Sequence, residues 1–369
     1  MLVTEFLLTL ACLCFLYILV LTWIFTGLDR LQISFSHEEP FVSIVVAARN
    51  EADNMHQLLH ALTHQSYPSE KYEIIIVDDQ SEDATTQIVY AFADERIRLV
   101  QTNNRHQVIS HKKNAINLGI YKAKGEIILL TDADCLPPVE WVSGMVQLFT
   151  PNVGMVIGFS PYELPELRTP FDFLLALESL SLAAVTAGTT GWDYPATASG
   201  RNLAYRKSLY QQVGGFDKIR DFISGDDDLM LKLVQSTPWK IRYAYDPKLT
   251  VPTRLVKSVR QFINQRLRHA SKGFHYDLKK VIVLLLVYFY NLLIFFTIPF
   301  ALFHRLSAWV PVLFIGIKAL GEFFVLYKFA SSMRRQRFLF VFPFAELLHI
   351  PYVVIFGALG PFKKVKWKG

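Results

Sequence analysis

Four long apolar stretches interrupt an otherwise normally charged chain. Residues 6–25 and 281–303 carry no charged side chain over about the 20 positions needed to cross a bilayer, so both predict transmembrane helices. Residues 309–327 and 338–359 are also apolar, but each contains charged side chains, which are rare in membrane spans. We expect all four stretches to be membrane helices of a multi-pass protein.

The first stretch predicts an uncleaved anchor, because it has no basic leader and no clear small-x-small cleavage site. Basic residues precede the span at 281–303 and lie between the last two spans, so positive-inside reasoning places the central region in the cytoplasm, at the plasma (inner) membrane. Four full crossings would place the lysine-rich tail on the opposite side, which conflicts with the rule. Either the last apolar segment is re-entrant or interfacial, or the positive-inside rule fails at this end.

Between about residues 40 and 280, short β-rich runs alternate with helical stretches, which predicts an α/β fold with a parallel sheet. The predicted strands are 41–47, 72–77, 97–101, 126–131 and 154–159, and the predicted helices are 54–64, 84–93, 112–121 and 139–149. A further apolar run at 171–187 is either a core helix or, as we favour, an interfacial helix that shapes an acceptor site.

Polar side chains follow three of the predicted strands. They are 49–51, 78–81 and the pair Asp132 and Asp134. Each has an ordinary alternative as a turn, a helix cap or a solvated loop. Ligands of open α/β sheets bind beyond the carboxyl ends of the strands, however, and two carboxylates one residue apart can hold a hard divalent cation there. The spacing therefore predicts a cation and nucleotide site at this edge.

Charge and cysteine usage narrow the class of protein. The 369 residues are 52% hydrophobic, with a formal net charge of +6. The stretch 254–280, beside a predicted span, adds strongly to the net charge, with eight Lys and Arg residues against one Asp, which favours anionic lipid or a phosphorylated substrate over nucleic acid. The three cysteines show neither a disulfide framework nor zinc spacing.

The ordered series of motifs resembles the family 2 glycosyltransferases, inverting enzymes of the GT-A fold, and in particular their membrane-anchored, cellulose-synthase-like branch. The matching stretches are 42–51, 74–81, 112–119, 132–134, 199–206, 214–217, 224–229 and 265–269. The resemblance implies a Rossmann-like, mixed and mostly parallel sheet, with transmembrane helices at both ends. It divides the chain into an anchor (1–30), a GT-A domain (40–253), a basic interfacial region (254–280), two or three C-terminal membrane helices (281–362) and a basic tail (363–369).

The resemblance also implies roles for individual residues. Asp226 is the expected general base, and Asp132 and Asp134 are the expected ligands of Mg²⁺ or Mn²⁺. The residues expected to bind the nucleotide sugar are Ala47, Arg49, Glu51, Asp79, Lys112, Asp132 and Arg268, with Lys112 beside the diphosphate. The residues expected on the acceptor side are Gly200, Asn202, Gln265 and His269. The bland alternative for the triplet 226–228 is a cluster that caps the following helix.

The stretch 265–269 resembles the Q-x-x-R-W element of the polymer-forming enzymes, but His269 stands where tryptophan is expected. We therefore expect a membrane-bound inverting glycosyltransferase that moves a sugar from a nucleotide diphosphate, UDP in the first instance, to a lipid, glycolipid or other membrane-associated acceptor. The alternatives are a processive polysaccharide synthase that extrudes its product and a non-catalytic, nucleotide-binding membrane scaffold.

Overall fold

The computed structural model describes residues 2–31, 34–103, 110–162, 168–222, 225–255, 259–270 and 276–360. The chain folds into two compact units. The sheet unit comprises Asp29–Glu166 and Thr189–Arg254, and the helical unit comprises Met1–Leu28, Leu167–Gly188 and Leu255–Gly369. The helix at Pro170–Thr190, which lies within the domain expected at 40–253, thus groups mainly with the helical unit.

The sheet unit alternates strands and helices along the chain. Its strands are β1 Val42–Ala48, β2 Tyr72–Asp78, β3 Ile97–Gln101, β4 Ile127–Leu130, β5 Val153–Ile157, β6 Leu203–Arg206 and β7 Lys240–Tyr243. Its α-helices are α2 Ala52–Thr63, α3 Thr85–Ala91, α4 His111–Lys122, α5 Trp141–Gln147, α7 Lys207–Gln212 and α8 Asp228–Gln235, with short 3-10 turns at Ser69–Lys71, Asp217–Ile219 and Pro247–Leu249.

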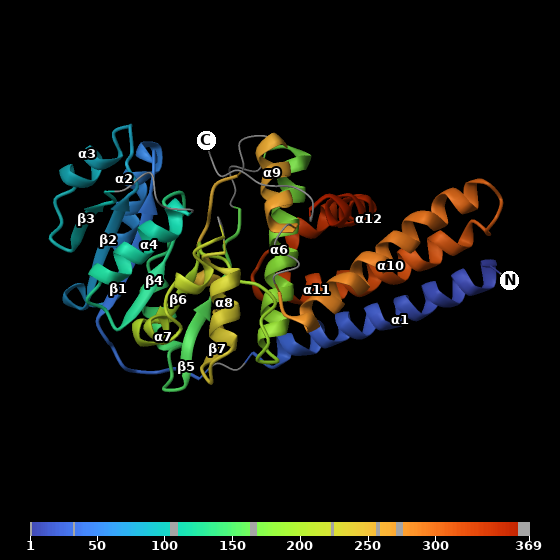
Figure 1. Cartoon of the computed structure of the whole chain (residues 1–369), viewed down its shortest axis with the longest axis horizontal. Helices are drawn as coiled ribbons and strands as arrows, with labels where there is room; N and C mark the ends of the chain where they lie inside the picture. Colours follow the sequence, from blue (N-terminus) through green and yellow to red (C-terminus); the bar gives the residue numbers. More distant parts are fainter. Residues whose placement is uncertain are drawn as a thin grey trace. The chain divides into compact units, whose positions relative to one another are not determined.

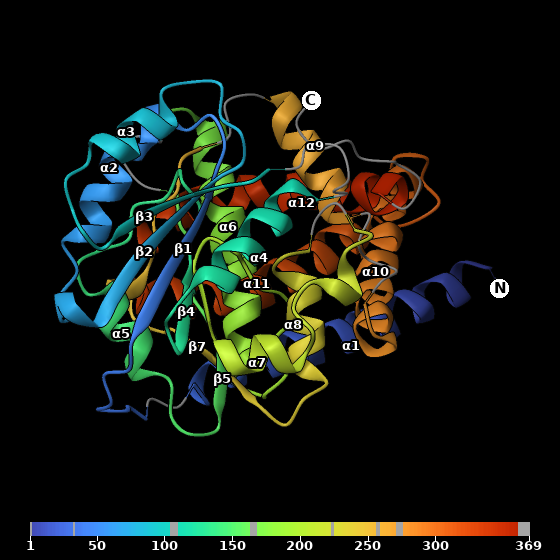
Figure 2. The ribbon, with the colours of Figure 1, turned by 60° about the vertical axis from the view of Figure 1, so that its left-hand side comes forward.

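The seven strands form one sheet in the order β3-β2-β1-β4-β6-β5-β7 (Figures 1 and 2). Strands β3, β2, β1 and β4 are parallel, and only β6 runs antiparallel to both of its neighbours. The predicted mixed and mostly parallel sheet is therefore confirmed. All seven residues of β2 are buried, as expected for a strand covered on both faces.

Alternate residues of the strands point to opposite faces of the sheet. One face packs on α2 and α5 in a core that contains Ile44, Ile74 and Trp141. The other face receives α4, and the approach is close at Gly119, where a Cβ atom would lie 2.4 Å from Cγ1 of Val45. Glycine at this position therefore lets α4 lie directly on β1, which fixes where the first turn of α4 is held.

The five strands predicted from the sequence are all present within one or two residues of their expected ends, whereas β6 and β7 were not predicted. Both are four residues long and contain basic side chains, whereas β4, which is equally short, is a wholly apolar run. Strand β6 forms because Leu203–Arg206 pairs with β4 and β5, which lie far from it along the chain. This long-range pairing decides its structure.

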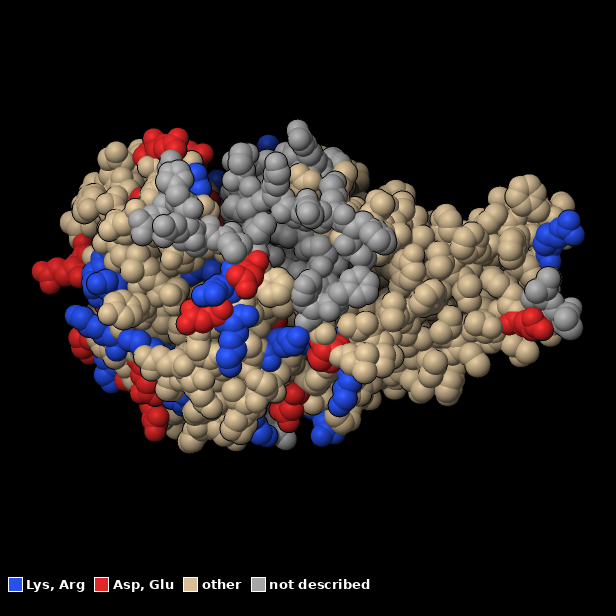
Figure 3. Space-filling view, viewed as in Figure 1, with Lys and Arg blue, Asp and Glu red and all other residues tan. Residues whose placement is uncertain are grey.

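The helical unit contains α1 Leu2–Asp29, α6 Pro170–Thr190, α9 Val259–Ala270, α10 Leu278–Leu302, α11 Trp309–Ser332 and α12 Phe342–Leu359, the last preceded by a 3-10 turn at Gln336–Val341. Within the described ranges, five segments are long and apolar enough to cross a membrane: the four that were predicted and Pro170–Thr190. In Figure 3 the described surface of α1 and α10 is almost free of charge along its length, whereas Lys, Arg, Asp and Glu crowd the surface of the sheet unit.

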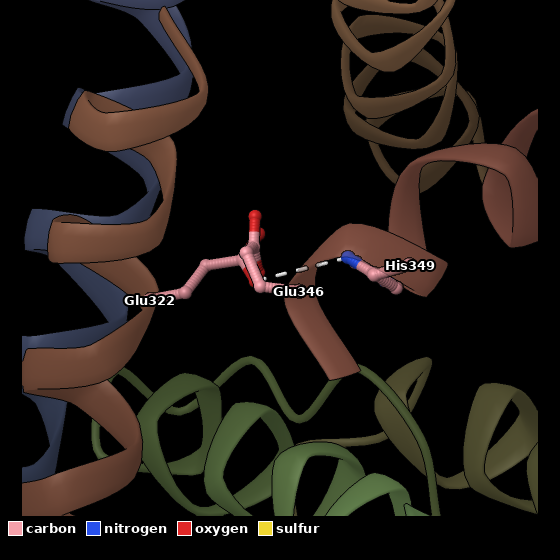
Figure 4. Close-up of side chains that lie close together, drawn as sticks. All are labelled: Glu322, Glu346 and His349. Carbon is pink, nitrogen blue, oxygen red and sulfur yellow. Dashed lines mark ion pairs between the residues drawn. The ribbon is translucent and has the colours of Figure 1, made fainter. Parts of the chain in front are cut away.

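A buried charge cluster joins α1, α11 and α12. Nζ of Lys318 lies 2.8 Å from a carboxylate oxygen of Glu322, 2.6 Å from one of Glu346 and 3.1 Å from Nδ1 of His349. Tyr17 of α1 donates a hydrogen bond to Glu322. Figure 4 shows Glu322, Glu346 and His349 converging, and their ligand atoms lie within 4.8 Å of one another. The ammonium group contacts all three, so this set already holds its own cation and we assign no metal to it.

Replacing Lys318 with alanine is expected to destabilise the helical unit. Lys318 is fully buried, and its loss leaves two carboxylates facing each other without a counter-charge, a change that costs about 3–5 kcal/mol in buried ion pairs. A lower melting temperature in detergent micelles checks this. The control is Lys279→Ala, at an exposed position near the start of α10, and equal melting temperatures for the two variants would contradict the prediction.

Candidate active site

The carboxyl ends of three neighbouring strands gather the polar residues singled out in the sequence. Strand β1 lies between β2 and β4 and is parallel to both, with Ala48 opposite Asp78 and Val45 opposite Leu130. The segments 49–51, 79–81 and 131–134 therefore leave the same edge of the sheet. This is the edge at which open α/β sheets bind ligands.

Lys112 joins two carboxylates from distant parts of the chain. It lies in the first turn of α4, and its Nζ is 2.7 Å from Oδ1 of Asp132 and 3.1 Å from Oδ2 of Asp226. Burial lowers the pKa of Lys112, but the two carboxylates more than offset that effect and hold the pKa above its ordinary value. The side chains of Lys112, Asp132 and Asp226 are 22%, 29% and 11% exposed, so solvent can reach the site.

The three carboxylates of the triplet 226–228 have different partners. Asp227 caps α8 by accepting from the backbone N–H of Asp228 at 2.7 Å. Asp228 is buried and accepts from the backbone N–H of Ala198 at 3.0 Å. The capping alternative thus applies to Asp227, while Asp226 faces Lys112.

Gly200 forms the wall beside this ion pair. A Cβ atom on Gly200 would lie 3.1 Å from Oδ2 of Asp226 and 3.6 Å from Nζ of Lys112. Gly225 precedes Asp226 with a φ of +100°, a backbone conformation that residues other than glycine rarely adopt. The two glycines allow the backbone to approach and turn at the point where the Asp226 carboxylate is placed.

The pair Asp132 and Asp134 has the donor set that a hard cation requires. Burial raises the pKa of Asp134, and the negative charge of Asp132 raises it further, against the opposing effect of Arg201 and Lys112. Two carboxylates that disfavour each other's ionisation are relieved by a shared divalent cation. The residues therefore fit Mg²⁺ or Mn²⁺, both of which prefer oxygen ligands.

The residues expected near the nucleoside lie at the ends of β1 and β2. Asp79 is buried and accepts from Oγ1 of Thr102 at 2.8 Å, with Nδ1 of His111 3.5 Å from its other oxygen. Glu51 immediately precedes α2 and accepts from Nδ2 of Asn54 at 2.6 Å. Arg49 is exposed and Ala47 is half-buried at the same edge.

One expectation from the sequence is wrong. Asn202 is fully buried: its Nδ2 donates to the carbonyls of Phe159 and Leu249, and its Oδ1 accepts from Nε1 of Trp141. It supports the core and does not reach an acceptor. Lys113, the neighbour of Lys112 in α4, is also buried: it is 3% exposed and donates to the carbonyl of Ile219.

Comparison with known proteins identifies this part of the chain. Residues 43–213 match the model of "Glycosyl transferase family 2". These residues form a family 2 glycosyltransferase domain. The matched range holds Lys112, Asp132 and Asp134, whereas Asp226 lies beyond its end.

Two relatives of this glycosyltransferase domain carry the names of sugar-transferring enzymes. The chain is 29% identical over 214 residues to "Glycosyltransferase AglE" of Haloferax volcanii, which covers 56% of this chain and 65% of that protein. It is 36% identical over 110 residues to "Beta-monoglucosyldiacylglycerol synthase" of Trichormus variabilis, a match that covers 30% of this chain and 24% of that protein. The matches thus span less than two thirds of either relative's own length.

The fold of the glycosyltransferase domain recurs in a solved structure. The structure of "Mannosyltransferase PcManGT from Pyrobaculum calidifontis in complex with GDP-Man and Mn2+" superposes with a TM-score of 0.55 and 21% identity, covering 94% of this chain and 99% of that one. At that identity the likeness establishes the shared GT-A fold.

Arg201 is a residue of the glycosyltransferase site to which the sequence analysis assigned no role. Its backbone carbonyl accepts from Oγ1 of Thr131 at 2.9 Å, which ties it to the end of β4. Its guanidinium lies 6.0 Å from the centre of the Tyr162 ring, and its charge lowers the pKa of Asp134. Arg201 stands within the motif at 199–206, so an arginine in a motif of this family was the available signal.

Three predicted site residues lie outside the sheet unit. Gln265, Arg268 and His269 belong to α9 in the helical unit, and the side chains of Arg268 and His269 lie outside what the structure describes. Their assignments to the diphosphate and the acceptor stay predictions, as does the assignment to the cellulose-synthase-like branch.

Replacing Asn202 with alanine is expected to destabilise the domain without changing donor affinity. The change leaves the indole N–H of Trp141 and two buried carbonyls without their partner, and each such group costs about 1–3 kcal/mol. Thermal unfolding with and without UDP measures both effects. Gln211→Ala, at an exposed position, is the control; a stable Asn202→Ala protein would contradict the structural role.

Proposed function

We propose that the protein is a membrane-bound inverting glycosyltransferase that moves a sugar from a nucleotide diphosphate to a lipid-linked or membrane-associated acceptor. The observation that supports this best is the position of Lys112, which contacts both Asp132 of the metal-ligand pair and Asp226. The group that binds the leaving diphosphate and the group that removes the acceptor proton are then within reach of one donor sugar.

The donor lies along the carboxyl edge of the sheet in this proposal. Asp79 and Glu51 bind the nucleoside at the ends of β2 and β1, and Lys112 turns from its carboxylate partners to the diphosphate, which it attracts as a positive charge. Mg²⁺ or Mn²⁺, held by Asp132 and Asp134, neutralises charge on the departing diphosphate when it is bound. We take UDP as the first nucleotide to test.

Asp226 is the general base of the proposed reaction. The acceptor hydroxyl oxygen forms a bond to the anomeric carbon from the face opposite the diphosphate, and the bond from that carbon to the phosphate oxygen breaks. Its electron pair leaves with the diphosphate, and the acceptor proton moves to Asp226. The configuration at the anomeric carbon is therefore inverted.

Five apolar helices support a membrane-bound acceptor. A catalytic domain carried by membrane helices has direct access to lipid-linked substrates. Positive-inside reasoning favours the cytoplasmic side for this domain, and we propose the plasma membrane as its location. The name of one relative, a glucosyldiacylglycerol synthase, describes a glycolipid product. His269 in place of tryptophan favours the transfer of one sugar over the polymer synthesis of the processive alternative.

The direct test is transfer by the purified protein in membranes that supply acceptors. Radiolabelled UDP-glucose, UDP-N-acetylglucosamine, UDP-galactose and GDP-mannose are each supplied with Mn²⁺, and lipid-extractable label is separated by size. One added sugar supports the proposal. A ladder of products supports the processive synthase, and absence of both transfer and donor hydrolysis with every donor supports the non-catalytic scaffold.

The variant Asp226→Asn is expected to lose transfer by about 10²–10⁴-fold, because the amide cannot accept the acceptor proton. Nucleotide affinity, measured by calorimetry with UDP, should change little. The matched control is Asp221→Asn, a side chain 78% exposed that lies five positions earlier. Wild-type turnover by Asp226→Asn would remove this residue from the mechanism.

Removal of divalent cations is expected to abolish transfer. Treatment with EDTA followed by dialysis should stop the reaction, and titration with Mn²⁺ or Mg²⁺ should restore it. The cation concentration needed for half-maximal activity should be at least about tenfold higher in Asp134→Asn than in the wild type, because the variant lacks one of the two carboxylate ligands. Asp53→Asn, at an exposed position in α2, is the control. Full activity in EDTA would exclude the cation from the reaction.

A further inference from the structure

The helix α9 carries the Q-x-x-R element, and a buried ion pair holds it within the helical unit. Nη2 of Arg266 lies 2.5 Å from Oε2 of Glu178 in α6. The other oxygen of Glu178 accepts from the hydroxyl of Tyr352 in α12 at 2.7 Å. One carboxylate therefore ties together three helices that are far apart in the sequence (Figure 1).

The ion pair between Arg266 and Glu178 is buried, so its loss would be costly. The Arg266 side chain is 9% exposed, and its Nε has no hydrogen-bond partner among the described residues, so Glu178 supplies the polar contact of the guanidinium. An arginine in such a site needs a counter-charge, and a glutamate within an apolar helix needs one equally. Replacing either partner alone therefore leaves the other charge buried without a counter-charge.

Aromatic rings provide further packing contacts that hold α9. The guanidinium of Arg266 lies 5.1 Å from the centre of the Phe262 ring, one helical turn earlier. Phe262 in turn meets Phe171 of α6 and Phe356 of α12 edge to face, at 5.5 and 6.4 Å between ring centres. Leu267, 3% exposed, lies on the buried side of the same helix. The face that includes Phe262 and Arg266 is thus the one by which α9 is attached.

The anchor continues into the buried charge cluster of the helical unit. The ring of Tyr352 stacks on His349, with 6.1 Å between centres, and Nδ1 of His349 contacts Lys318. Tyr352 therefore has its hydroxyl on Glu178 and its ring on the cluster. The position of α9 is tied through it to the centre of α11 and α12.

We propose that Glu178 and Tyr352 are positioning residues for glycosyl transfer: by holding Arg266 they set the position of α9, the helix that presents Gln265 and Arg268. This inference rests on the proposed function. Neither residue needs to touch a substrate. Their loss should lower the turnover of bound substrates, because Asp79, Lys112 and Asp134, which bind the donor in the proposed mechanism, lie in the sheet unit and are unchanged.

The experiment compares Glu178→Gln, Tyr352→Phe and Arg266→Lys with Glu5→Gln, an acid-to-amide control at an exposed position of α1. In Glu178→Gln, kcat should fall about tenfold or more, the scale of losing one charge-assisted hydrogen bond, while the Kd for UDP stays within about twofold. The exchanged pair Glu178→Arg with Arg266→Glu should recover a substantial part of kcat. Wild-type kcat in both Glu178→Gln and Tyr352→Phe would overturn the proposal.

A second readout is independent of catalysis. Leu267→Cys, in a Cys12→Ala background, places a thiol on the buried face of α9, and its labelling by a polar maleimide should be slow with the anchor intact and about tenfold faster in Glu178→Gln. Unchanged labelling in an active protein overturns the anchor and leaves the transferase function standing. Faster labelling in a protein whose wild type transfers no sugar refutes the function and leaves the attachment of α9 standing.

Discussion

The site is organised around one ammonium group. Lys112 reaches from the first turn of α4 to Asp132 after β4 and to Asp226 before α8. Without a positive charge between them, these carboxylates would repel each other at the same edge of the sheet. The position of Lys112 depends in turn on the close contact of α4 with β1 at Gly119. The packing of α4 on the sheet therefore determines where the positive charge of the site lies.

Charge pairing recurs in the helical unit with a different outcome. Lys318 lies among Glu322, Glu346 and His349, and Glu178 lies between Arg266 and Tyr352. Lys318 is fully buried, whereas Lys112 keeps some exposure to solvent. Burial makes the cluster around Lys318 a fixed junction between helices. Exposure leaves Lys112 able to exchange its partners for an anionic ligand, which the proposed binding of a diphosphate requires.

The triplet 226–228 shows how neighbouring, chemically identical side chains acquire separate roles. Asp227 caps α8, Asp228 accepts from the backbone at Ala198, and Asp226 faces Lys112. The positive φ of Gly225 and the absence of a side chain at Gly200 give the Asp226 carboxylate its place. A sequence pattern marks the triplet as acidic, and backbone geometry assigns the roles within it.

The sequence by itself determined the elements with strong local signals: the four apolar spans, the strands β1 to β5, and the carboxylates that follow β2 and β4, because periodicity and composition are local properties. Only the tertiary structure decided the remainder. Strand β6 exists through pairing with distant strands, Asn202 proved to be a core residue because three partners surround it, and Lys113 is buried beside the solvent-accessible Lys112. Each of these outcomes depends on contacts between segments tens of residues or more apart, which no local pattern encodes.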